Sequence, residues 1–130
     1  MTALSLRGVR GGVGTSSVLA AVGYALHTLG ERVLMIDMCP ENLLRLHFNL
    51  VASEKNGWAR AMLDGDDWHV QAWSLAPTLA LLPYGVLSWQ ESMRVEQQLL
   101  DDPILWARRQ ASLAAHYDWV LFDLPQRLQG

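Results

Sequence analysis

One short segment near the N-terminus has the residue types that bind phosphate. It reads Arg10-Gly11-Gly12-Val13-Gly14-Thr15-Ser16 and follows an apolar stretch, residues 3–9. Glycines let the backbone curl around an anion without clashes from Cβ atoms, and the N-terminus of a following helix adds partial positive charge. The Ser16 hydroxyl, at the start of that helix, is placed to ligate Mg²⁺. The alternative is a glycine-rich turn that binds no ligand.

Two aspartates add carboxylates at the ends of apolar runs. Asp37 ends the run 33–36, and Asp123 ends the run 119–122. In open α/β sheets, ligands bind beyond the carboxyl ends of the strands. A carboxylate there can hold Mg²⁺ or its water, or orient a nucleophilic water. One such aspartate alone is more often a helix cap or a turn residue, but two of them with a glycine loop favour a nucleotide site.

The elements that must position these residues alternate along the chain. Strands are expected at 3–9, 33–36, 79–82 and 119–122, and helices at 16–29, 41–48, 57–63, 88–100 and, from an Asp102-Pro103 start, to about 115. The segment 68–77 is ambiguous. Strands that alternate with helices predict an α/β fold with a mainly parallel sheet.

Composition limits the class of protein. The chain has 130 residues, a net charge of −3 and 51% hydrophobic residues, which fits one globular domain. Its arginines are scattered, so no nucleic-acid partner is expected. The single cysteine, Cys39, excludes an internal disulfide. With neither a signal-peptide pattern nor a bilayer-spanning apolar run, a cytoplasmic location is expected.

Side chains outside the motifs are expected to be structural. The helix after Ser16 is expected to bury one apolar face, made of Val18, Leu19, Val22, Ala25, Leu26 and Leu29. The six tryptophans favour core positions. The four histidines lack partners at ligand spacing, and Arg108-Arg109 is expected on a solvated helix face.

Three of these segments together resemble the motifs of the MinD/ParA family of deviant Walker A ATPases. Residues 8–16 resemble the family's Lys-Gly-Gly-x-x-Lys-Thr/Ser loop, 33–40 its Asp-x-Asp-Pro motif, and 121–125 its Walker B strand. The resemblance implies a P-loop NTPase fold and MgATP as ligand. Nucleotide would be bound by Arg10, Gly11, Gly12, Val13, Gly14, Thr15, Ser16 and Ser17. Mg²⁺ would be held, directly or through water, by Ser16, Asp37 and Asp123, and Asp37 is also a candidate for positioning water.

Two further segments, 37–46 and 57–65, resemble a narrower group, the MinD-like accessory proteins of bacterial cellulose secretion. This resemblance implies that the full-length form is a homodimer gated by nucleotide. Its partners would be subunits of the membrane cellulose synthase complex, with peripheral attachment to the inner membrane through them. Relatives of this kind are about twice as long. Residues 1–130 would then be the N-terminal part of a single NTPase domain, truncated after the Walker B strand, with an exposed sheet edge.

Three positions depart from the family pattern. Arg10 stands where the family has its signature lysine, Thr15 where it has the lysine that contacts phosphates, and Cys39 where it has the second aspartate. Arginine keeps the charge, but threonine loses it, and a neutral thiol is a poor substitute for a carboxylate. The departures imply nucleotide binding with weak or absent hydrolysis. An active ParA-type partitioning ATPase and a nucleotide-free scaffold remain as alternatives.

Overall fold

The fold is built on one five-stranded sheet. The computed structural model describes residues 1–7, 12–49 and 55–125. Its strands are β1 (Thr2–Arg7), β2 (Val33–Asp37), β3 (Trp73–Ala76), β4 (Leu79–Leu82) and β5 (Trp119–Leu124). They lie in the order β1-β5-β2-β4-β3, and only the β3–β4 pair is antiparallel. The predicted α/β fold with a mainly parallel sheet is therefore confirmed.

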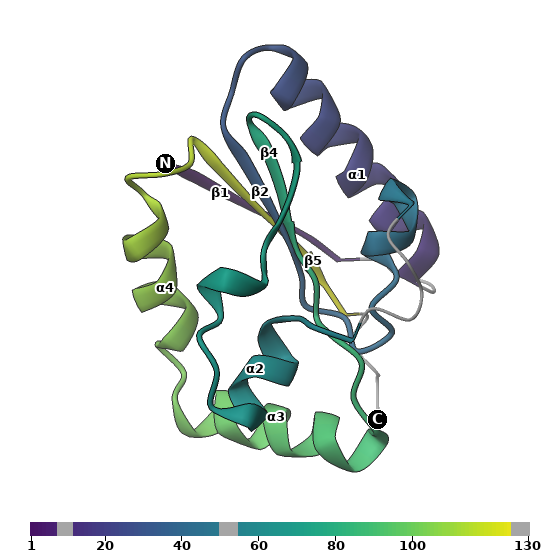
Figure 1. The fold of residues 1–130 in the computed structure, drawn as a ribbon, viewed down its shortest axis with the longest axis vertical. Coiled ribbons are helices and arrows are strands. Elements are labelled where there is room, and N and C mark those ends of the chain that lie inside the picture. The colour runs from purple at the N-terminus through teal and green to yellow at the C-terminus, as the bar shows by residue number, and fades with distance from the viewer. Residues whose placement is uncertain (8–11, 50–54, 126–130) are drawn as a thin grey trace.

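Helices cover the sheet on two sides (Figure 1). The long helix α1 (Gly12–Thr28) and the short 3₁₀ helix η1 (Leu44–Phe48) lie against one face. The other face carries α2 (Trp58–Asp64), α3 (Trp89–Asp101) and α4 (Leu105–Leu113), with η2 (His69–Gln71) before β3. None of the described helices is long and apolar enough to cross a membrane.

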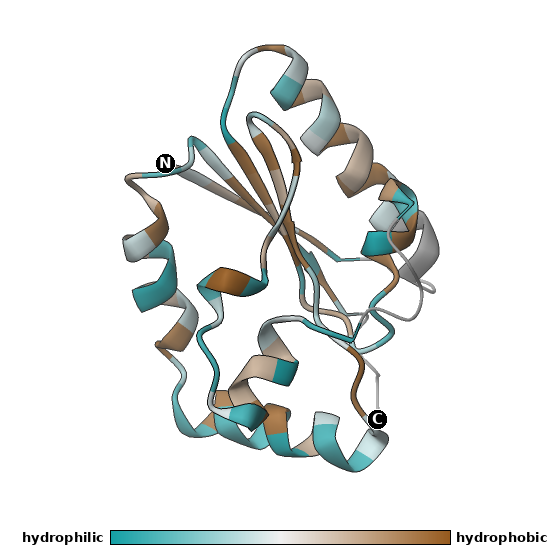
Figure 2. Cartoon of the chain, in the orientation of Figure 1, coloured by the Kyte–Doolittle hydropathy of each residue, from teal (hydrophilic) through white to brown (hydrophobic). Residues whose placement is uncertain are grey.

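The central strands supply two cores because their side chains alternate between the faces. In β2, Val33 and Met35 pack against Leu19 of α1, whereas Leu34 and Ile36 pack against the three helices opposite. Every residue of β2 is buried, and Figure 2 shows the central strands largely in the brown of hydrophobic residues. Continuous burial explains why this strand has an unbroken apolar run.

Several element boundaries differ from the sequence-based expectations. Helix α1 begins at Gly12 rather than at residue 16, and the helix expected at 41–48 is the short η1. The ambiguous segment 68–77 contains η2 and the extra strand β3. Asp102 was expected to cap α4, but it lies at the C-terminal end of α3, and α4 starts after Ile104 without a side-chain cap. Ser88 instead begins α3 with a capping box.

The predicted buried face of α1 is partly wrong. Leu19, Val22 and Leu26 pack inward, but Val18 is 54% and Leu29 79% exposed. Gly23 completes the buried stripe, because a Cβ at this position would run into the Met35 side chain. A helix that passes close to a sheet needs a small residue at the contact. The buried face of α1 therefore depends on packing as well as on which residues are apolar.

The environments of Trp89 and Arg109 also differ from the sequence-based expectations. Trp58 is fully buried, but Trp89 is 74% exposed. Arg109 is not on a solvated face, because its guanidinium lies 4.7 Å from the ring centres of both Trp68 and Trp106. Burial lowers its pKa to about 10. Two of the histidines have partners: His27 lies within hydrogen-bond distance of Thr78, and His69 of Asp67.

One edge of the sheet is open among the described residues. β1 pairs with β5 along its full length, and its six residues are exposed or half-buried. Three of its six residues are apolar, and the Leu4 side chain is exposed. An exposed edge strand is a template for further pairing.

Helix α2 is fixed to the end of β4 by its first turn. The Trp58 and Ala59 amides donate to the carbonyl oxygens of Pro83 and Tyr84 at 2.9 and 3.0 Å. Gly57, just before the helix, lies so close that a Cβ there would overlap the backbone of Tyr84 and Gly85. This approach of two backbones is possible only with glycine, and it sets where α2 lies beneath the sheet edge.

We expect Gly57→Ala to lower the free energy of unfolding by about 1 to 3 kcal/mol, because overpacking forces backbone shifts. Gly65→Ala is the matched control: Gly65 ends α2 at a φ of +74° with open space around it. Its cost is backbone strain alone, about 1 kcal/mol. Urea unfolding of both variants measures the difference, and a Gly57→Ala protein as stable as the parent would show that the loop after β4 adapts freely.

Candidate functional site

The two predicted aspartates meet at the carboxyl edge of the sheet. Asp37 ends β2 and Asp123 lies near the end of β5, and the parallel register pairs them directly. Both side chains are fully buried. Adjacent parallel strands end at the same edge, and residues in register point to the same face of the sheet. The structure therefore places the two strand-ending carboxylates side by side.

Ser16, which follows the glycine loop in the sequence, contacts one of these two aspartates. It lies in α1, is 2% exposed, and its hydroxyl donates to Asp123 Oδ2 at 2.5 Å. Gly12, Val13, Gly14 and Thr15 lie in the first turns of α1, followed by Ser17, whose side chain is exposed. The predicted binding residues Arg10 and Gly11 fall outside the described residues.

The carboxylate of Asp37 is held by the loop that follows it. Its Oδ1 accepts from the Cys39 amide at 2.9 Å and its Oδ2 from the Leu44 amide at 3.2 Å. The main-chain carbonyl of Asp37 accepts from the Trp58 indole at 2.7 Å. Asp37 therefore organises the turn after β2, which is a structural role that the sequence analysis did not anticipate.

Asn42 is a second positioning residue that the sequence analysis missed. It is 2% exposed and adopts a left-handed conformation with φ of 57°. Its amide oxygen accepts from the amides of Tyr84 and Gly85, at 3.1 and 3.3 Å. Asparagine is one of the few residues that tolerate this backbone conformation and offer an acceptor. The sequence feature that could have identified this residue is an asparagine a few positions after an aspartate that ends a strand.

Burial dominates the electrostatics of the site. It raises the pKa of Asp37 to about 7, against the two amides that donate to its carboxylate. Burial also raises the pKa of Asp123, against the hydrogen bond from Ser16. The pKa of the Cys39 thiol is raised by burial and by the neighbouring carboxylates. The three acidic groups therefore share a region where negative charge is costly.

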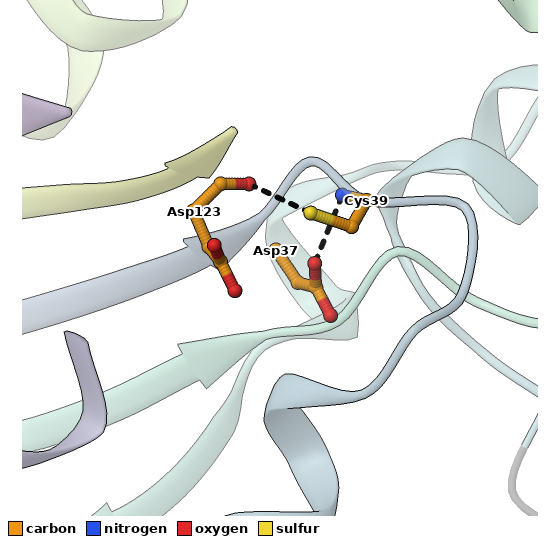
Figure 3. A group of neighbouring side chains, drawn as sticks. All are labelled: Asp37, Cys39 and Asp123. Carbon is orange, nitrogen blue, oxygen red and sulfur yellow. Dashed lines mark hydrogen bonds between the residues drawn. The ribbon is translucent and has the colours of Figure 1, made fainter. Parts of the chain in front are cut away.

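The donor set fits a divalent cation. Asp123 Oδ1 is buried and has no hydrogen-bond partner in the part of the chain that the structure describes, and such an oxygen is costly unless something satisfies it. Oxygen ligands from carboxylates and a hydroxyl suit Mg²⁺. Asp37, Asp123 and Ser16 are therefore the described residues that could hold Mg²⁺. Cys39 lies in the same cluster (Figure 3), and its ligand atom and those of both aspartates lie within 4.8 Å of one another.

Solved structures with the same fold include nucleotide-binding proteins. Cobyrinic acid a,c-diamide synthase from Mycobacterium smegmatis, solved with a bound ATP analogue and magnesium, superposes with a TM-score of 0.79 at 23% identity. The match covers 98% of this chain and 51% of that one. The cell-division ATPase MinD of Pyrococcus furiosus gives a TM-score of 0.72 at 24% identity, over 98% and 51% of the two chains. These likenesses show the P-loop NTPase fold.

Sequence comparison is more specific. The chain is 46% identical over 128 residues to the cellulose biosynthesis protein BcsQ of Escherichia coli K12, covering 97% of this chain and 51% of that protein. It is 45% identical over 127 residues to BcsQ of Salmonella typhi, covering 96% and 50%. The chain thus spans about half the length of these relatives. Because the family model described as cellulose biosynthesis protein BcsQ matches residues 1–130 in full, the chain belongs to the BcsQ family of cellulose biosynthesis proteins.

Proposed function

We propose that this chain is the N-terminal, phosphate-binding part of a MinD/ParA-like accessory protein of bacterial cellulose biosynthesis. In this proposal it binds MgATP, dimerises in a nucleotide-dependent way, and regulates or localises the membrane cellulose synthase from the cytoplasm through protein partners. Hydrolysis is weak or absent. Membership of the BcsQ family supports the cellulose context, and the fold supports the nucleotide.

The observation that carries the proposal is the contact between Ser16 and Asp123. It joins the first turns of α1, directly after the glycine loop, to the strand that ends in Asp123. Asp37 lies beside Asp123 in register. A helix N-terminus next to a hydroxyl and two carboxylates is the arrangement in which P-loop proteins hold phosphate and magnesium together.

Each group has a distinct part in this proposal. Main-chain amides at the start of α1 bind phosphate oxygens, and Ser16 and Asp123 hold the cation. Asp37 is the second carboxylate of the site, and the hydrogen bonds it accepts from the Cys39 and Leu44 amides keep the turn after β2 in place. Magnesium, when bound, neutralises phosphate charge. Arg10 supplies a permanent positive charge that can reach phosphate in forked geometry.

Weak hydrolysis follows from two side chains. Thr15 brings no positive charge to the phosphates, and Cys39 brings a thiol where the MinD/ParA motif has an aspartate. The Cys39 thiol is buried and its pKa is raised, so it does not accept a proton from water near neutral pH. Phosphate release at rates usual for active ATPases, abolished in Asp37→Ala, would instead favour an active partitioning ATPase.

Calorimetry with ATP and with inorganic tripolyphosphate, each with and without Mg²⁺, tests binding. Tripolyphosphate is included because the glycine loop contacts only phosphates. We expect Mg²⁺-dependent binding that Ser16→Ala and Asp123→Asn weaken by on the order of 10- to 100-fold, as loss of groups around a metal does. Asp66→Asn, at an exposed position, is the control and leaves affinity unchanged.

Absence of heat with both ligands would overturn the binding proposal and favour the nucleotide-free scaffold. Equal affinity in the parent and in Asp123→Asn would place any binding elsewhere. Light scattering of the full-length form with and without MgATP tests dimerisation separately. A molecular mass that stays monomeric in both conditions would contradict the gated dimer without affecting the binding result.

A further inference from the structure

The candidate site contains a sulfur ligand as well as oxygen ligands. We propose that Asp37, Cys39 and Asp123 form a binding site for a thiophilic divalent cation of the zinc class, in preference to Mg²⁺ and without any nucleotide. The inference goes beyond the proposed function, since it concerns the metal alone. It rests on the placement of the thiol and on an unsatisfied carboxylate oxygen.

The turn after β2 places the Cys39 thiol next to the end of β5. Because the Cys39 amide donates to Asp37 Oδ1, the chain folds back at once and places Cys39 over the strand ends. Its Sγ lies 3.5 Å from the main-chain oxygen of Asp123. Figure 3 shows the thiol and the two carboxylates arranged around a common point, although they come from β5 and from the end of β2.

An unpartnered oxygen within the cluster points to a ligand independently of the cysteine. Asp123 is fully buried, and its Oδ2 accepts from Ser16, but its Oδ1 has no hydrogen-bond partner among residues 1–7, 12–49 and 55–125. Water does not reach such an atom freely, so its desolvation goes uncompensated in the metal-free protein. A cation bound to Oδ1 removes this penalty, which gives the site a reason to be occupied.

The ligand geometry suits a small tetrahedral ion. Zinc binds sulfur at about 2.3 Å and oxygen at about 2.0 to 2.2 Å, so two ligands of one ion lie roughly 3 to 4 Å apart. The ligand atoms here lie within 4.8 Å of one another, a spread that small side-chain rotations close. Three protein ligands leave a fourth position open, as in catalytic zinc sites.

The thiol determines the preference among metals. Mg²⁺ takes oxygen ligands in octahedral geometry and gains little from sulfur. Zn²⁺ and Co²⁺ accept thiolate and carboxylate together. On binding, the Cys39 sulfur gives its proton to solvent and becomes a thiolate ligand. Cysteine in place of the second aspartate of the MinD/ParA motif therefore changes which ion this cluster favours.

Titration of the reduced, nucleotide-free chain with Co²⁺, followed by absorption spectroscopy, tests the inference. Cys39 is the one cysteine, so a thiolate-to-cobalt charge-transfer band reports this residue. We expect the band to saturate at one Co²⁺ per chain, to disappear with equimolar Zn²⁺, and to persist in a large excess of Mg²⁺. Cys39→Ser abolishes the band and weakens Co²⁺ binding by at least about 10-fold.

Two further variants complete the design. Cys39→Asp keeps a metal ligand but loses sulfur, so Mg²⁺ should compete with Co²⁺ in this variant. Asp67→Asn breaks the exposed Asp67–His69 pair, another place where Co²⁺ could bind by chance, and should leave the titration unchanged. Circular dichroism verifies that each variant is folded.

Three results would overturn the inference. They are the absence of a charge-transfer band at saturating Co²⁺, parental Co²⁺ affinity in folded Cys39→Ser, and displacement of Co²⁺ from the parent by equimolar Mg²⁺. None of them depends on nucleotide. If the chain binds MgATP but shows no cobalt band, only the thiophilic site is refuted. If it shows the band but has no affinity for nucleotide, only the proposed function is refuted.

Discussion

Trp58→Ala is expected to lower the free energy of unfolding by about 3 to 5 kcal/mol, the range for removing a large aromatic side chain from a core. Trp58 is fully buried and packs edge-on against Tyr84 and Trp106. Its indole also donates to the Asp37 carbonyl. The truncation thus leaves a cavity and an unpaired carbonyl at once. Urea unfolding followed by circular dichroism measures the loss.

Trp58→Phe separates these two contributions. Phenylalanine fills most of the volume but cannot donate, so the expected cost is smaller, about 1 to 3 kcal/mol for the lost hydrogen bond. Trp89→Ala is the matched control, because Trp89 is 74% exposed. A Trp58→Ala protein as stable as Trp89→Ala would mean that the core beneath the candidate site is not the one described.

The stability of the chain is expected to fall by about 2 to 3 kcal/mol between about pH 5 and about pH 8 because of Asp37 alone. The pKa of Asp37 is raised from 3.8 to about 7 by burial. Between these values the folded chain binds one proton more than the unfolded chain, so stability is full below the lower value and is lost as the pH rises through the upper one. Urea unfolding at several pH values gives the slope.

Asp37→Asn isolates this contribution. Asparagine carries no charge, so the contribution of Asp37 to the pH dependence of stability disappears. The variant also loses some stability at every pH, because only one side-chain oxygen remains to accept from the Cys39 and Leu44 amides. Burial also raises the pKa of Asp123, which acts in the same sense and remains in both proteins. Asp118→Asn, at an ion pair with Arg32, is the control, and it should keep the parental slope over this range. Parallel slopes for the parent and Asp37→Asn would show that Asp37 is ionised in the folded chain.

The sequence was sufficient for those parts of the site that depend on strand ends. Asp37 and Asp123 each follow an apolar run, and buried parallel strands leave few positions where a carboxylate can lie other than their carboxyl edge. The alternation of strands and helices was enough for the fold class. Ser16 followed from its place after the glycines, and its contact with Asp123 is the detail that the sequence did not contain.

Other features depend on packing that no local pattern records. The exposure of Val18 and the burial of Gly23 follow from the angle at which α1 crosses the sheet. The sequence around Arg109 suggests a surface residue, and only the fold shows that its guanidinium lies 4.7 Å from the ring centres of both Trp68 and Trp106. β3 is short and pairs only at an edge, so alternation over four residues could not separate it from a loop.

The order of strands in space has a consequence for how the chain reaches this structure. β5 is the last of the described strands along the chain, yet it lies between β1 and β2, and Thr2 pairs with Trp119. On the ribosome, β1 and the loop that follows it must therefore wait for most of the sequence before their neighbour arrives. Contacts between such distant segments slow folding and leave apolar strands exposed meanwhile. The two aspartates can therefore come together only after β5 has taken its place beside β2.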